Sequence, residues 1–248
     1  MKWRRLGFAV LVTVVFLLPY AQKPWWQYFH TTIVLLALWG LRWGKEGMVR
    51  LGLGLRLRDA GIVLVAFPGV WFLSRLLLLA VARSEGVVRA SFAFPENVDP
   101  LYQALNEELL LGFLFLTALR RYLRNPHLLA GAVAVAFALA HVVFYRWLSV
   151  HQTWLAPAGV LAVAFVGLAR NYLILLGGHV GFAWVLHAGW NLTFLGGAWS
   201  RAGVRVSEPD LFGLFLGNPL VLAMAAGLGL LGAAAMAWCG PHPRFGRG

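Results

Sequence analysis

Residues 101–119, LYQALNEELLLGFLFLTAL, form an apolar run of membrane-spanning length that contains two adjacent carboxylates. Glu107 and Glu108 follow the polar residue Asn106 in this run. Placing an acid near the centre of a membrane helix costs about 3 kcal/mol, and two neighbouring acids repel each other when both are ionised. One of the two is therefore expected to be protonated or to have a cationic partner. The pair predicts a proton-handling site inside the membrane; the alternative is a buried polar contact between packed helices.

The composition is that of a membrane protein. Of the 248 residues, 60% are hydrophobic and 12% are charged, whereas soluble domains carry about a quarter charged residues. The formal net charge is +12, but the cations occur in short clusters between apolar runs, as do the residues that orient helices in a bilayer. We therefore expect a lipid bilayer and no nucleic acid as a partner. Cys239 is the single cysteine, which excludes an internal disulfide and a cysteine-based metal cluster.

Counting the apolar runs that can cross about 30 Å of hydrocarbon predicts an all-α polytopic protein with about eight transmembrane helices. These form a single integral membrane domain over residues 1–248. The first span resembles a signal peptide but lacks an A-x-A-like cleavage site, so we expect it to be retained. The last span is long enough for a tilt or for a break at Gly217-Asn218-Pro219. The predicted spans are residues 6–20, 26–41, 61–82, 101–119, 127–145, 154–169, 172–198 and 211–238.

Lysine and arginine collect on one side of this arrangement. The N-terminus, residues 42–60, residues 120–126, Arg170 and the C-terminal tail together hold 14 of the 21 Lys and Arg residues, against six on the other side. The excess predicts that both termini are cytoplasmic. Arg75 falls within the third span and belongs to neither side.

Three polar residues in other spans are expected at the depth of the carboxylates. His141 lies in the fifth predicted span. His187 and Asn191, four residues apart in the seventh span, project from one helix face. With the orientation above, all three lie in the outer half of the bilayer, as Glu107 does. The sequence therefore predicts an active site buried between helices 4, 5 and 7, within a catalytic core at residues 101–198.

These groups suit hydrolysis. A carboxylate and a histidine that share a water form a general base, and a second histidine with an amide one turn later can donate two hydrogen bonds to a developing oxyanion. Such a site needs no serine or cysteine nucleophile and no cofactor. The same groups could instead bind Zn²⁺, which two histidines and a carboxylate suit. Spacing alone leaves both interpretations open.

The chain resembles the CPBP family of intramembrane proteases, which includes the type II CAAX prenyl endopeptidases and many bacterial relatives. The family pattern is EExxxR, then FxxxH, then HxxxN, on three helices of an eight-span fold. Residues 107–108 begin the first motif, residues 137–141 match the second and residues 187–191 match the third. The order and spacing fit, and the resemblance covers residues 101–191.

The resemblance implies a glutamic-type endopeptidase that acts on a protein tail within the membrane. In this family, Glu107 and His141 would activate the water. His187 and Asn191 would hold the oxyanion, and Glu108 would be the supporting acid.

One position departs from the family pattern. The arginine of EExxxR is missing, and Gly112 takes its place. The cation that balances the acid pair is then expected elsewhere in the chain, with Arg75 as the candidate, unless one carboxyl stays protonated.

The resemblance, taken with the predicted orientation, implies a protein of the bacterial inner membrane whose active site faces outward. Its substrates would be exported or membrane-anchored proteins that carry short C-terminal sorting tags. The alternatives are a non-catalytic scaffold that binds a peptide tail in the same pocket, and a zinc-dependent peptidase. A proton-coupled transporter would use the acids as a relay, but transporters often contain paired repeats, and the sequence has no evident internal repeat.

Overall fold

The computed structural model describes residues 32–39, 52–89, 99–142, 156–195, 199–202, 204–205 and 213–246, and the single positions 7, 11, 41, 46 and 49. The first predicted span lies outside these residues except for two positions. Of the second, residues 32–39 are helical. The count of eight spans therefore stays a prediction.

The described chain is helical, with one small sheet that the sequence did not predict. The longer helices are α3 (Leu57–Ser84), α6 (Pro126–Ala140), α8 (Ala156–Gly177), α9 (Gly181–Leu195) and α11 (Pro219–Cys239). A helical rod precedes α6 and consists of α4 (Asp99–Glu107), the π-helix η2 (Glu108–Leu114) and α5 (Phe115–Leu119). Strands β1 (Val87–Arg89), β2 (Trp199–Arg201) and β3 (Val204–Arg205) pair antiparallel, with Val88 opposite Ser200, and the short helix α12 (Pro243–Gly246) comes last. Strands this short carry no readable alternation of polar and apolar residues.

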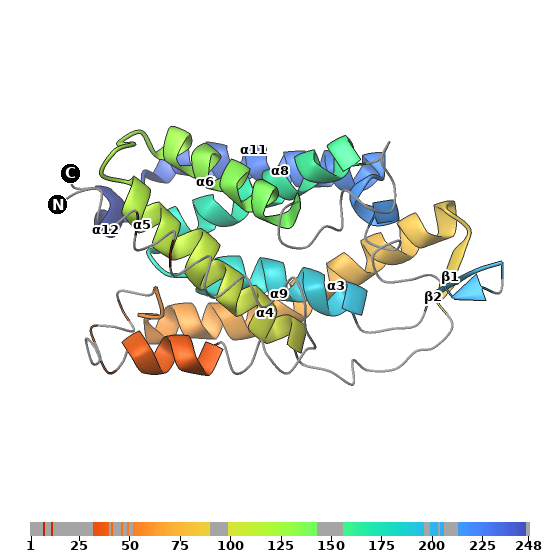
Figure 1. Cartoon of the computed structure of the whole chain (residues 1–248), viewed down its shortest axis with the longest axis horizontal. Coiled ribbons are helices and arrows are strands. Elements are labelled where there is room, and N and C mark those ends of the chain that lie inside the picture. Colours follow the sequence, from red (N-terminus) through yellow and green to blue (C-terminus); the bar gives the residue numbers. More distant parts are fainter. Residues whose placement is uncertain are drawn as a thin grey trace.

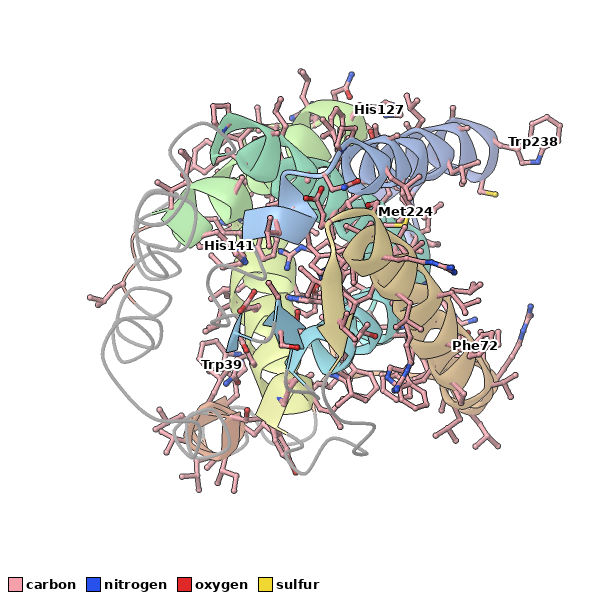
Figure 2. The ribbon with its side chains drawn as sticks, turned by 90° about the vertical axis from the view of Figure 1, so that its right-hand side faces the viewer. Trp39, Phe72, His127, His141, Met224 and Trp238 are labelled. Atoms are coloured by element: carbon pink, nitrogen blue, oxygen red, sulfur yellow. The ribbon has the colours of Figure 1, made fainter. Side chains whose placement is uncertain are left out.

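Three of the described helices are long and apolar enough to cross a membrane: Leu57–Ser84, Pro157–Gly177 and Pro219–Cys239. The outer faces of α3 and α11 consist of large apolar side chains, and Phe72 and Trp238 point away from the other helices (Figure 2). Hydrocarbon accepts such faces, whereas water would disfavour them. The protein is a multi-pass membrane protein.

Helix α8 lies between two other helices. It packs against α6 on one side and α11 on the other, and the three run side by side in Figure 1. Helix α9 packs against α3 and α4, and η2 contacts both α6 and α8. The predicted helices 4, 5 and 7 therefore come together, with α8 as a further neighbour. The sheet lies at one end of the molecule, far from α12 (Figure 1).

An Asn-Pro pair begins both α6 and α11. The Asn125 side chain accepts hydrogen bonds from the backbone N–H groups of His127 at 2.8 Å and Leu128 at 3.2 Å. The Asn218 side chain accepts one from Leu220 at 2.9 Å. A side-chain oxygen at the cap and a proline in the first turn both favour a helix start. Residues 213–216 are helical and α11 begins only at Pro219, so of the tilt and the break left open for the last span, the structure shows the break.

The predicted boundary between spans six and seven is wrong. Helix α8 continues through Arg170 and ends before Gly178, which has a positive φ of 72° and whose N–H donates to the Ile174 carbonyl at 2.8 Å. Hydropathy treats an isolated arginine as a loop residue, whereas α8 buries Arg170 completely. Removing it from the cation count leaves 13 (14 − 1) against six, so the predicted orientation is unchanged.

Candidate active site

The structure brings four of the five predicted site residues together. Glu107 ends α4 and Glu108 begins η2, while His141 directly follows α6 and His187 lies on α9. Both carboxylates are fully buried, but 13% of the His141 side chain and 8% of the His187 side chain are exposed. The exposed part of the carboxylate–histidine group therefore belongs to its two histidines.

The two oxygens of Glu107 have different surroundings. Oε1 accepts a hydrogen bond from the Gln103 side chain at 3.2 Å. Oε2 lies 3.8 Å from His141 Nε2 and 3.6 Å from His187 Nε2. Gln103 thus holds one oxygen while the other faces both imidazoles. Gln103 is not among the residues predicted from the sequence, although its position four residues before Glu107 places the two on one helix face.

The tautomer of His141 follows from its backbone contact. Its Nδ1 lies 2.9 Å from the Phe137 carbonyl oxygen, and a carbonyl only accepts hydrogen bonds, so Nδ1 carries the proton. In the neutral ring, the lone pair of Nε2 is then turned toward Glu107. The Phe137 ring packs against His141 and His187 at centroid distances of 4.4 and 5.9 Å. The phenylalanine of the FxxxH motif therefore supports both imidazoles.

Glu108 joins the second histidine to a cation. Its Oε1 lies 2.8 Å from His187 Nδ1 and accepts a hydrogen bond from Arg170 Nη1 at 2.9 Å. A carboxylate oxygen accepts from both groups, so His187 Nδ1 carries a proton. This contact fixes the His187 ring through Nδ1, so that Nε2, on the opposite side of the ring, faces Glu107.

The cation paired with the acids is therefore Arg170, and the suggestion of Arg75 is wrong. Arg75 lies on α3, with its guanidinium carbon 5.7 Å from the centre of the Trp71 ring. Arg170 could have been found from the sequence, because the adjacent glycines that end the helix, Gly177-Gly178, come two turns after it. Reading the helix to that point would have placed an arginine inside a span, where it requires an acid.

Asn191, the fifth predicted site residue, follows His187 by one turn of α9 and is 6% exposed. Residues four apart share a helix face. Asn191 thus lies beside the group of four at the level of the next turn.

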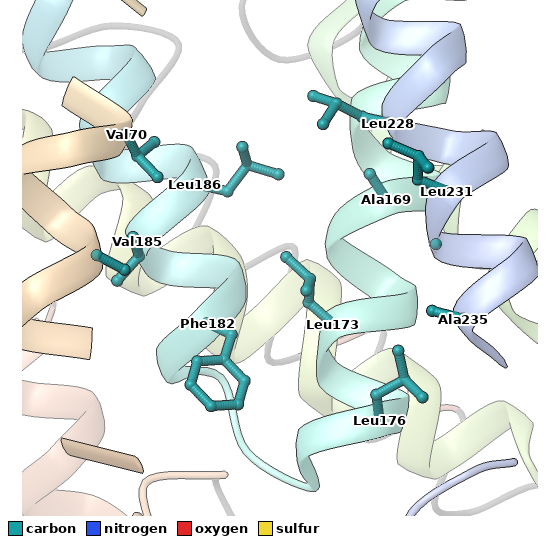
Figure 3. Close-up of a pocket in the computed structure, with 12 residues that line it drawn as sticks. Val70, Ala169, Leu173, Leu176, Phe182, Val185, Leu186, Leu228, Leu231 and Ala235 are labelled. Atoms are coloured by element: carbon teal, nitrogen blue, oxygen red, sulfur yellow. The ribbon is translucent and has the colours of Figure 1, made fainter. Parts of the chain in front are cut away.

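An apolar cavity of about 420 Å³ lies between α3, α8, α9 and α11 (Figure 3). Val70, Leu173, Leu186 and Leu228 are among its lining residues, none of which belongs to the predicted site. Within the part of the chain that the structure describes, no three His, Cys, Asp or Glu side chains are arranged to hold a metal ion. The candidate site is therefore the buried carboxylate–histidine group.

The comparison with protein families supports this carboxylate–histidine group as the candidate site. Residues 98–193 match the family described as type II CAAX prenyl endopeptidase Rce1-like, and this segment contains all five predicted site residues. No curated protein and no solved structure matches the chain. The resemblance seen in the sequence is confirmed over the matched residues: they form a domain of the Rce1-like type II CAAX prenyl endopeptidase family, whose members are glutamic-type intramembrane endopeptidases.

Proposed function

We propose that this protein is an intramembrane endopeptidase that hydrolyses a peptide bond near the C-terminus of a membrane-anchored or exported protein. One observation carries the proposal: Glu107 Oε2 faces the Nε2 atoms of His141 and His187 at 3.8 and 3.6 Å. A water beside these atoms can contact the carboxylate and both imidazoles at hydrogen-bond distance. General-base hydrolysis requires such an arrangement.

In the proposed reaction, Glu107 takes a proton from this water, while the lone pair of His141 Nε2 holds the water in place. The water oxygen bonds to the carbonyl carbon of the substrate and forms a tetrahedral intermediate. When the carbon–nitrogen bond breaks, Glu107 gives its proton to the departing nitrogen. The products are a carboxylate and an amine.

His187 and Asn191 form the oxyanion hole in this proposal. A His187 that donates through both ring nitrogens is an imidazolium, and the Glu108 carboxylate at 2.8 Å from Nδ1 stabilises that charge. The Asn191 amide supplies the second donor. Arg170 and the His187 imidazolium then balance the two carboxylates, and this neutrality reduces the cost of burying the group.

The cation distribution supports a site toward the outer face of a bacterial inner membrane, with both termini cytoplasmic. The substrates of such a site are exported or membrane-anchored proteins. The protein tail reaches the site from the side where part of the His141 side chain is exposed.

Glu107→Gln tests the proposal, because it keeps the shape of the side chain but removes the base. C-terminal peptides of membrane proteins are compared by mass spectrometry between cells that express the wild type and the variant. We expect longer C-termini to accumulate on a small set of proteins in the variant. The control is Glu46→Gln, the same substitution at an exposed glutamate outside the site, which should leave the C-termini as in the wild type.

Two outcomes would contradict the proposal in different ways. Identical C-termini in the wild type and Glu107→Gln, with both proteins stably present, would point to a scaffold that binds a tail without cutting it. Cleavage by the purified protein that EDTA abolishes and Zn²⁺ restores would instead support the zinc-dependent alternative.

A further inference from the structure

Gly112 occupies the position of the missing motif arginine, and it borders the buried ion pair. A Cβ atom added at Gly112 would lie 2.8 Å from Ile174 Cδ1, 3.2 Å from Glu108 Oε2 and 3.5 Å from Arg170 Nη2. The guanidinium from α8 therefore fills the space beside residue 112. A side chain at this position would compete with it.

Arg170 is enclosed on all sides. Its side chain is fully buried, Nη1 donates to Glu108 at 2.9 Å, and its guanidinium carbon lies 3.7 Å from the centre of the Phe137 ring. Gly167, one turn earlier on α8, lets the helix approach this ring, since an added Cβ would lie 3.0 Å from Phe137 Cδ1. A buried charge is tolerated when it is paired, and a cation over an aromatic face is further stabilised. The Arg170 guanidinium is thus held by one ion pair and one aromatic face.

The contacts of Glu108 connect Arg170 to His187. One carboxylate oxygen, Oε1, lies 2.9 Å from Arg170 Nη1 and 2.8 Å from His187 Nδ1. Two hydrogen-bond donors on a single oxygen fix the carboxylate between them. The orientation of the His187 ring toward Glu107 therefore depends on where Arg170 holds Glu108.

We infer that Arg170 is a positioning residue. It supplies from α8 the guanidinium that the EExxxR pattern places at residue 112, and the glycine at residue 112 leaves the space that this guanidinium requires. Arg170 acts on the reaction through Glu108 and His187 and does not touch the substrate. The inference rests on the proposed peptidase function for its catalytic part, whereas the placement of the Arg170 guanidinium beside Glu108 and Gly112 stands on the contacts alone.

A reciprocal exchange tests the inference. The variants are Arg170→Gly, Gly112→Arg and the double variant, each purified in detergent. We expect each single variant to unfold at a lower temperature and to cleave roughly 100-fold more slowly, since Arg170→Gly breaks a buried pair and Gly112→Arg adds a second side chain where Arg170 lies. The double variant should recover part of both properties, because Arg170→Gly frees the space of the guanidinium and the atoms nearest to an added Cβ at residue 112, Ile174 Cδ1 and Glu108 Oε2, are the ends of side chains.

Separate values of kcat and KM distinguish positioning from general stability. Arg170 contacts Glu108 and the Phe137 ring and not the substrate, so its loss should displace Glu108 and His187 and lower kcat with little change in KM. A purely structural role would reduce the amount of folded protein but leave the kcat of the folded molecules unchanged. The double variant should recover part of kcat. Arg75→Gln, another arginine inside a helix, is the control and should keep the wild-type kcat and KM.

Each result has a defined meaning. An Arg170→Gly protein with wild-type melting temperature and kcat would overturn the inference, as would a double variant no better than either single one. If Arg170→Gly does not accumulate, Arg170→Lys replaces it, with a smaller loss of stability expected because the charge is kept. A wild type without any cleavage would refute the proposed function, and the melting temperatures would still decide whether a guanidinium at residue 112 can replace the one at residue 170.

Discussion

At the scale of single residues, the position of Glu107 depends on Gln103. The Gln103 side chain is 6% exposed and donates to Glu107 Oε1 at 3.2 Å. A hydrogen bond to a charged group contributes about 1.5–3 kcal/mol. We expect Gln103→Leu to lower kcat by about 10-fold or more with little change in KM, because Gln103 contacts the base and not the substrate. Steady-state kinetics with a peptide substrate measures both constants.

Thr117→Val is the matched control for this substitution. Thr117 lies on α5, and its hydroxyl donates to the carbonyl of Leu114 in the same helical rod at 2.9 Å. Replacing it also removes a polar group from a membrane helix, but not one that contacts the acids. A Gln103→Leu protein with the same kcat as Thr117→Val would show that Gln103 has no part in placing the base.

At the scale of the helices, the close approach of α6 and α8 holds the second motif in place. In Gly167→Ala, the new Cβ would lie 3.0 Å from Phe137 Cδ1 and 3.3 Å from the Ala134 backbone. Backbone cannot yield as a side-chain end can, so the helices must separate, and overpacking of this kind costs about 1–3 kcal/mol. We expect a lower melting temperature and slower cleavage, because Phe137 supports both imidazoles. Thermal unfolding in detergent and a cleavage assay measure these changes.

Gly131→Ala on α6 provides the control, since an added Cβ there meets nothing within 4 Å. Alanine stabilises a helix interior by about 0.5–1 kcal/mol relative to glycine, so this variant should unfold at the same temperature as the wild type or higher. Equal melting temperatures for Gly167→Ala and Gly131→Ala would mean that the helix contact is not tight.

The same scale shows how much the sequence could predict. The meeting of Glu107, His141 and His187 followed from hydropathy and cation counts, because depth in a bilayer limits which residues can touch. Arg170 was missed because hydropathy reads a charge as a helix end, although a paired arginine can lie inside one. The π-helix could not be predicted either, because residues 108–114 also suit an ordinary α-helix. The feature that goes with the wider turn is the packing of η2 against α6 and α8, which the sequence does not contain.

At the scale of the whole molecule, the proposed substrates depend on which end of the helices faces outward. The sheet lies at one end, while α5 and α12 lie together at the other (Figure 1). The cation excess predicts that the sheet end faces outside. Two exposed positions can report on this: Val88 in β1, which is 66% exposed, and Arg124 in the turn after α5.

Single cysteines at these positions test the orientation in a Cys239→Ser background, which removes the single native thiol. In intact cells, a membrane-impermeant maleimide should label Val88→Cys but not Arg124→Cys, and permeabilised cells should show labelling of both. The physical reason is that arginines are expected to stay on the cytoplasmic side. With the arginines after α5 on that side, the rod α4–η2–α5 would enter from outside and carry Glu107 in its outer half. Labelling of Arg124→Cys alone in intact cells would show the opposite orientation, with the site toward the cytoplasm. Exported proteins would then be excluded as substrates, and cytoplasmic protein tails would take their place.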